Sequence, residues 1–205
     1  MDHSFAEIET QTPRELLPAF YKQYRLDEDG GKSKPHVKIE LTKKIFLYIP
    51  NFTARKKAVL KHDIHHIVTG YPSTITGETE ISAWEIASGC KKYWAAWVLD
   101  MSGMMMGIVF NFWGVIKAFA RGRKTKNLYY NIISTEEVLD MKLSELQKFL
   151  WLDKYPKNTK PGFVDFILFV LLVLIGAIYS ILSIIFLPFI IIYTIYIIVS
   201  HRLQH

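Results

Sequence analysis

Residues 62 to 66 read His-Asp-Ile-His-His, and Glu78 follows them after a Gly- and Pro-containing stretch. His62 and His66 are four positions apart, so a helix places them on one face, about 40° apart, with Asp63 about 100° from His62. Two imidazoles and two carboxylates are a typical donor set for a divalent metal ion. The sequence therefore predicts a metal site with four ligands, which are His62, Asp63, His66 and Glu78.

The sequence around this motif predicts the helical setting that the site requires. Thr53 is a typical N-cap residue for a helix that runs to about Val68, and Gly70 marks its end. A loop over 70–77 separates it from a second helix over 78–92. Glu78 then lies in the first turn of the second helix, where it can face the first helix and where the helix dipole favours its ionised form.

The sequence leaves alternative roles for three side chains in or near the motif. Asp63 is expected to bind metal, with the alternative that it orients a histidine. His65 lies about 60° from His62 on the other side, which favours a structural role close to the site. Glu85 is seven positions after Glu78 and shares its face, so Glu78 and Glu85 are the candidate catalytic residues. A structural ion pair is the alternative for Glu85.

Composition narrows the class of protein. Half of the 205 residues are hydrophobic and the net charge is +6. Cys90 is the single cysteine, which excludes an internal disulfide framework and a thiolate-rich zinc finger. The densest cationic run lies at 121–126. Because no nucleic-acid-binding motif accompanies it, we expect an anionic lipid surface as its partner and no nucleic acid.

The remaining patterns predict a mainly α-helical domain over 1–155 with one short β-hairpin. A continuous apolar helix over 94–119 is expected either to be buried in the core or to contact lipid. Alternating apolar residues predict the hairpin at about 37–49, turning near Thr42 and Lys43. Helical spacing and a capping box predict three further helices, over 13–26, 136–141 and 143–150.

The C-terminal region predicts a membrane segment. A linker over 156–163 leads into residues 164–199, which are apolar apart from Asp165, and a tail follows over 200–205. One membrane span needs about 20 residues and two need about 40. The segment therefore predicts either a transmembrane hairpin divided at Pro188, which the flanking cations favour, or a single span. The expected location is the bacterial cytoplasmic membrane, with the main domain on its cytoplasmic side.

The metal motif, His-Asp-x-x-His followed after eleven residues by Glu, resembles the signature of the coenzyme Q biosynthesis protein 4 family. The matching residues are His62, Asp63, His66 and Glu78, with Gly77 before the glutamate. The neighbourhood of Glu80, Trp84 and Glu85 is also similar, as is the stretch from Arg121 to the acidic and leucine-rich residues 136–146. The resemblance covers roughly residues 53–152.

The resemblance implies a mainly helical, membrane-associated protein of ubiquinone biosynthesis. It implies C1 decarboxylation, coupled to hydroxylation, of a polyprenylated hydroxybenzoate, which would make the chain a metal-dependent lyase. It also implies a role in organising a biosynthetic complex, with protein partners and a homo-oligomer as expectations. The implied metal is zinc, and the donor set is equally suited to iron or manganese.

Two alternatives remain open from the sequence. The chain can be a non-enzymatic scaffold, or a protein that binds a lipid or quinone intermediate, with a structural metal. It can also be a metal-dependent hydrolase, for which His36 and Asp100 are the available additional ligands.

Overall fold

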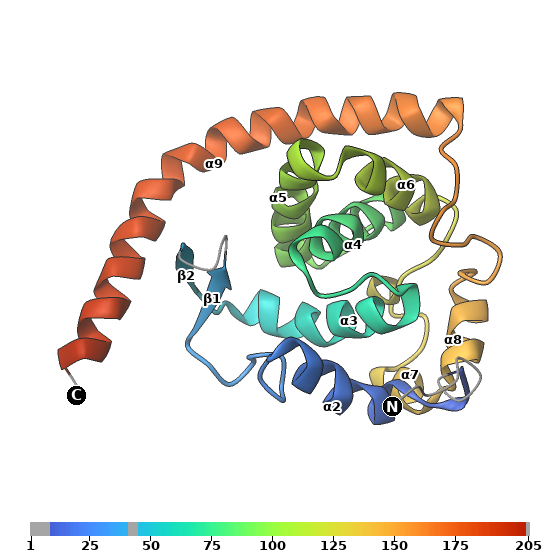
Figure 1. The fold of residues 1–205 in the computed structure, drawn as a ribbon, viewed down its shortest axis with the longest axis horizontal. Helices are drawn as coiled ribbons and strands as arrows, with labels where there is room; N and C mark the ends of the chain where they lie inside the picture. The colour runs from blue at the N-terminus through green and yellow to red at the C-terminus, as the bar shows by residue number, and fades with distance from the viewer. Residues whose placement is uncertain (1–8, 41–44, 204–205) are drawn as a thin grey trace.

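The computed structural model describes residues 9–40 and 45–203. The chain is mainly helical, with a two-stranded antiparallel hairpin and a long apolar C-terminal helix, as the sequence predicts (Figure 1). The elements, in chain order, are α2 (Pro13–Tyr24), β1 (His36–Glu40), β2 (Phe46–Pro50), α3 (Thr53–Thr69), α4 (Ile75–Ser88), α5 (Trp94–Phe110), α6 (Phe112–Gly122), the short 3₁₀ helix η1 (Leu128–Tyr130), α7 (Thr135–Asp140), α8 (Leu143–Phe149) and α9 (Phe163–Leu203).

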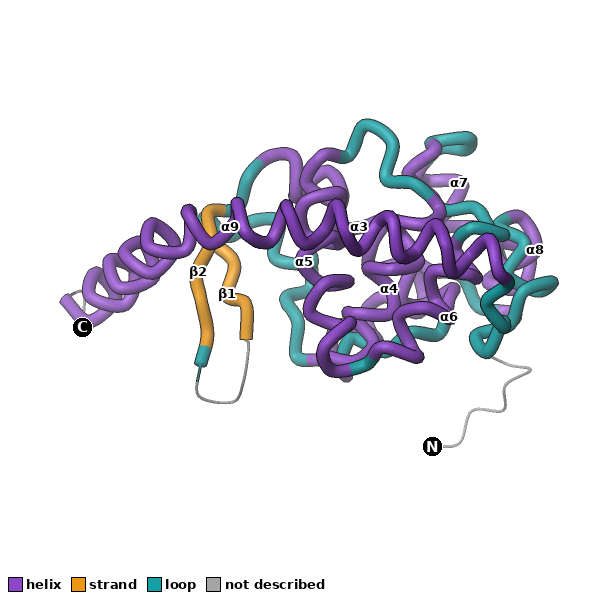
Figure 2. The backbone as a smooth tube through the Cα atoms, turned by 90° about the horizontal axis from the view of Figure 1, so that it is seen from above, coloured by secondary structure: helices purple, strands orange, loops and turns teal. Residues whose placement is uncertain are grey.

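Helix α4 is the centre of the domain. It packs against α5 and α6 on one side and against α3 on the other (Figures 1 and 2). Its Ile81, Ala83 and Trp84 have no exposed surface, because apolar side chains surround the helix. Close approach to α6 depends on Gly122, where an added Cβ would lie 2.4 Å from the carbonyl oxygen of Trp84. This packing places α4 between α5 and α6 on one side and α3, which carries the histidine motif, on the other.

The helix expected over 94–119 is instead two helices, α5 and α6, divided at Asn111. Asn111 leaves the helical conformation (φ −148°, ψ 44°), and its amide donates to Glu80 Oε1 at 3.2 Å. The turn lets both apolar helices pack on α4, which one straight helix could not do. Periodicity missed the break because the apolar residues continue on both sides of it.

Other boundaries differ by a few residues. Helix α3 is capped at Phe52 without a side-chain bond, so Thr53 is its first residue and not its cap. Helix α4 begins earlier than expected, because Thr74 accepts the bond from Gly77 N that starts it. It ends at Gly89, whose φ of +93° favours glycine.

The β-hairpin agrees with the alternating pattern. β1 and β2 pair in antiparallel register, with Val37 opposite Ile49 and Ile39 opposite Leu47. The turn expected near Thr42 and Lys43 lies outside the described residues, as do the last two residues of the tail.

Helix α9 is one uninterrupted helix of 41 residues that contains Pro188. The structure therefore has a single helix where the sequence favoured a helical hairpin. The helix passes over α5 and α6 and then curves past the hairpin (Figure 1). It is long and apolar enough to cross a membrane.

Candidate metal centre

His62 and His66 lie on one face of α3 with their Nε2 atoms 3.2 Å apart. The other nitrogen of each ring already has a partner: His62 Nδ1 lies 3.1 Å from Glu85 Oε1, and His66 Nδ1 lies 2.9 Å from the carbonyl oxygen of Tyr71. A carbonyl oxygen can only accept, so the proton of a neutral His66 is on Nδ1. Its Nε2 lone pair then points at His62.

Glu78 completes a group of three. Its carboxylate lies 3.4 Å from His62 Nε2 and 3.3 Å from His66 Nε2, and Ser73 donates its hydroxyl proton to it at 2.6 Å. Gly77 explains the position of Glu78, since a Cβ there would lie 1.8 Å from the carbonyl oxygen of Pro72. The missing side chain lets the first turn of α4 fold closely against the preceding loop.

These three residues fit a divalent metal ion. One ligand atom from each of His62, His66 and Glu78 lies within 4.8 Å of the other two. Two neutral imidazoles with protonated Nδ1 atoms would place two lone pairs face to face, which a cation between them relieves. His66 is almost fully buried, whereas the side chains of His62 and Glu78 are 24% and 37% exposed. A bound ion would therefore retain an approach from solvent, as a catalytic site requires.

The electrostatics of the group favour positive charge at His62, which a proton or a metal ion can supply. Burial opposes a positive charge on His62, but Glu85 and Glu78 outweigh it and raise the His62 pKa well above its usual value. Burial likewise opposes the charge on Glu78, and the two histidines overcome it and lower the Glu78 pKa. The site thus holds an ionised carboxylate and attracts positive charge.

Glu85 lies behind His62 and is fully buried. Its carboxylate faces Nδ1 of His62 and Nδ1 of His65, and it accepts a bond from the Tyr129 hydroxyl at 3.0 Å. His65 must be a donor at Nδ1, because its Nε2 accepts from the backbone N–H of Leu128 at 2.9 Å. This carboxylate therefore fixes the orientation of His62 and is well placed to raise the basicity of its ring.

Asp100 is brought beside Glu85 by α5. Burial and the charge of Glu85 raise the Asp100 pKa well above its usual value, so the protonated carboxyl is favoured. The Cys90 thiol lies 3.4 Å from Asp100 Oδ2. His62, Glu85 and Asp100 form a second group with metal-ligand spacing. Glu85 is already occupied by three donors and is sealed from solvent, so the His62, His66 and Glu78 group is the better metal centre.

Asp63 is not brought into either group. Its carboxylate accepts a bond from the Tyr21 hydroxyl at 2.9 Å and is almost fully buried, and burial raises its pKa. The packing of α2 is the reason: the histidines face α4, whereas Asp63, about 100° around α3 from His62, faces α2. A Cβ on Gly30 would lie 2.7 Å from Asp63 Oδ2, so the loop after α2 closes over the carboxylate.

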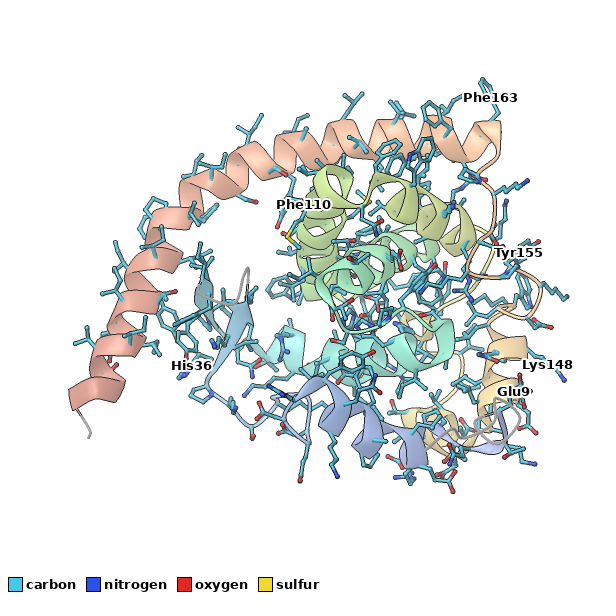
Figure 3. The ribbon with its side chains drawn as sticks, viewed as in Figure 1. Glu9, His36, Phe110, Lys148, Tyr155 and Phe163 are labelled. Atoms are coloured by element: carbon cyan, nitrogen blue, oxygen red, sulfur yellow. The ribbon has the colours of Figure 1, made fainter. Side chains whose placement is uncertain are left out.

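The sequence indicated some of this arrangement and missed the rest. His65 has the structural role expected of it. The sequence could have indicated that Asp100 belongs to this cluster, because a lone carboxylate in the apolar helix α5 requires a buried partner. Tyr129 gave no signal, since its position depends on the chain folding back at η1. His36 packs against Tyr48 in the hairpin (Figure 3). Among the described residues, the groups with metal-ligand spacing include Asp100 but not His36, so these do not bring together the additional ligands of a hydrolase.

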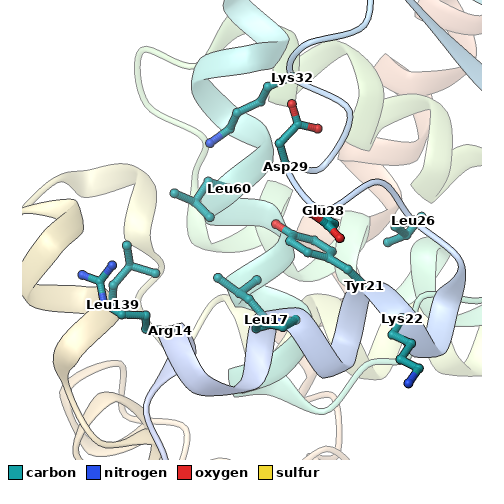
Figure 4. Close-up of a pocket in the computed structure, with 11 residues that line it drawn as sticks. Arg14, Leu17, Tyr21, Lys22, Leu26, Glu28, Asp29, Lys32, Leu60 and Leu139 are labelled. Carbon is teal, nitrogen blue, oxygen red and sulfur yellow. The ribbon is translucent and has the colours of Figure 1, made fainter.

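A groove of about 820 Å³ lies between α2, the following loop, α3 and α7. Leu17, Leu60 and Leu139 supply apolar walls, and Tyr21 lies in it (Figure 4). Its lining does not include His62, His66 or Glu78. Tyr21, through its bond to Asp63, links the groove to α3 next to the metal centre.

No protein-family model, curated protein or solved structure matches the chain.

Proposed function

We propose that this chain is a membrane-anchored, metal-dependent protein that acts on a polyprenylated hydroxybenzoate in ubiquinone biosynthesis, at the step of C1 decarboxylation and hydroxylation, with dioxygen as the oxidant that the hydroxylation requires. The sequence resemblance supplies the reaction, and the convergence of His62, His66 and Glu78 is the observation that supports it best. The apolar helix α9 supports the proposal that the substrate is lipid-soluble.

Each residue has a definable part in such a site. His62, His66 and Glu78 would hold the ion, with zinc expected and iron or manganese as alternatives. When bound, the ion would supply a Lewis acid that stabilises the negative charge developing as CO₂ leaves. Glu85 holds His62 in place through Nδ1, and Ser73 holds Glu78 through its hydroxyl.

A decarboxylation assay tests this proposal. Full-length protein in lipid nanodiscs is loaded separately with zinc, iron or manganese, and CO₂ release from a carboxyl-labelled prenylated hydroxybenzoate is measured. His66→Ala is expected to abolish release, and His36→Ala, which alters a histidine of the hairpin, is expected to retain it. Full activity in His66→Ala, or none in the wild type with any of the three metals, would contradict the proposal.

A second candidate is a scaffold with a structural metal. The observation that favours it is that the ligands join two helices, His62 and His66 on α3 and Glu78 on α4. In that case, metal removal unfolds the domain and no substrate is turned over. Circular dichroism before and after chelation, measured beside the activity assay, separates the two functions.

A further inference from the structure

Helix α9 is fixed to the domain at its beginning. Asp165 is almost fully buried and pairs with Arg123 at 2.7 Å. One turn later Phe169, only 1% exposed, packs its ring against Phe119 and Phe112 of α6 at centroid distances of 5.4 and 6.0 Å. The first turns of α9 therefore belong to the core and do not project from it.

The middle of α9 is held against α5. A Cβ at Gly176 would lie 2.4 Å from Met105 Sδ, so the two helices approach closely at a residue without a side chain. One turn further on, the Tyr179 hydroxyl lies 3.1 Å from the Val98 carbonyl oxygen and 3.0 Å from Ser102 Oγ. The tyrosine thus directs its polar group toward the domain.

The last part of α9 is held by the hairpin. Thr194 Oγ1 accepts a bond from the backbone N–H of Tyr48 in β2 at 2.9 Å, and Thr194 and Ile197 are buried. Both ends of the apolar segment therefore contact the same domain. A helix that crossed a bilayer with its two ends on opposite sides would have to give up the contacts of one end.

The outward side of α9 is apolar, and so is the corner between α5 and α6, whose Phe112 contacts Phe169 of α9. At that corner Val109 and Phe110 are each 75% exposed and Trp113 is 71% exposed. Large exposed aromatic side chains at one edge of a domain are typical of residues that lie at the headgroup level of a bilayer. Lys117 and Lys157 line the same pocket as Trp113, where Lys157 also pairs with Glu80 at 3.7 Å. The exposed Lys117 is the cation that best suits an anionic lipid headgroup.

We propose that α9 lies in the plane of a membrane, and that its outward side and the Val109–Trp113 corner insert together into one leaflet. The ends of α9 then stay on the side of the domain. An in-plane helix on its own keeps a polar side toward water. Here α9 rests on protein at its first turns, near Tyr179 and again near Thr194, whereas residues 184–189 are exposed on every side. A helix that is apolar all round therefore fits between protein and lipid in the first three places and fits immersion in lipid in the fourth. This inference does not depend on the metal or on the proposed reaction.

Single cysteines in the full-length chain test the proposal. Phe110→Cys reports on the corner, Ser200→Cys on the end of α9, and Lys154→Cys on the exposed part of the domain after α8. The wild type is the labelling blank, because its Cys90 is fully buried. Each variant is reconstituted into vesicles of phosphatidylcholine and phosphatidylglycerol.

Two measurements decide the result. A polarity-sensitive dye at position 110 is expected to shift to the blue when vesicles are present, and the same dye at position 154 is not. A thiol reagent that cannot cross membranes is expected to modify positions 154 and 200 to the same extent before the vesicles are permeabilised. Modification of 200 only where 154 is protected would overturn the proposal in favour of a span. A blue shift at 110 that appears without lipid, with a stable dimer, would overturn it in favour of a second copy of the chain.

Discussion

In most proteins, polar side chains are exposed and apolar side chains are buried. Helices α3 and α9 both depart from this distribution, in opposite ways. Helix α3 buries Lys61, Asp63, His65 and His66, which carry ionisable groups. Helix α9 exposes most of its isoleucine, leucine and phenylalanine side chains. Burying polar groups and exposing a continuous apolar surface both cost free energy in water.

The two helices resolve this cost differently. The polar groups of α3 find partners inside the protein, as His65 does with Glu85 and Leu128. Two of them, His62 and His66, join Glu78 in a candidate metal centre. Among the described residues, α9 is covered on its inner side only, and residues 184–189 are not covered at all. We infer that a partner from outside the chain covers the exposed apolar surface. In this molecule, the buried polar groups of α3 therefore indicate where a metal ion could bind. The exposed apolar side of α9 indicates which surface meets a partner.

The largest expected loss of stability comes from the hydrogen bonds that Glu85 of α4 makes with α3 and η1. Glu85→Ala would leave the donors of His62, His65 and Tyr129 buried without an acceptor, which is expected to cost about 3–5 kcal/mol of unfolding free energy. Urea unfolding of the full chain in detergent micelles, followed by circular dichroism, measures it. Glu145→Ala on the exposed side of α8 is the control. Equal midpoints for the two variants would mean that the network does not stabilise α3.

A smaller loss is expected where α9 meets α5. Gly176→Leu forces a side chain into the space of Met105, and overpacking of this kind costs about 1–3 kcal/mol. Ile175→Leu, at the neighbouring exposed position, is expected to be neutral. The same micelle unfolding assay compares them. If both are neutral, α9 is not packed on the domain as described.

Tyr21→Phe tests the other side of α3. It removes the bond to Asp63 and leaves a buried carboxylate without that donor, at a cost of about 1 kcal/mol. Tyr24→Phe, on the same helix, is the matched control. Thermal unfolding that shifts equally in both variants would show that the bond to Asp63 contributes nothing.

The effect expected at Asp100 has the opposite sign and depends on pH. Its folded-state pKa is raised by burial and by Glu85, so its contribution to stability is fully present below its unfolded pKa of about 4 and is lost as pH rises through the folded value. Asp100→Asn cannot ionise. The variant should match the wild type at low pH and become the more stable protein as pH rises. Denaturation midpoints across pH 4–9 that never diverge would contradict the raised pKa.

The sequence predicted features that depend on local spacing. Predictions from it were wrong where a feature depends on contacts between distant segments. His62 and His66 could be placed because a helix fixes their angle, and the hairpin because alternation fixes its register. Asp63 was predicted as a ligand from the same angles, but its place opposite Tyr21 depends on how α2 packs. The break at Asn111 and the course of α9 likewise follow from tertiary packing, which periodicity does not contain.

Metal content is the most direct test of the central claim, that the polar cluster of α3 and α4 is a metal centre. Full-length protein is purified without chelator, and its metals are measured by mass spectrometry against protein concentration. We expect one divalent ion per chain in the wild type and in His36→Ala, and almost none in His66→Ala. A wild type without metal after incubation with zinc, iron and manganese, or equal metal in His66→Ala, would contradict the claim.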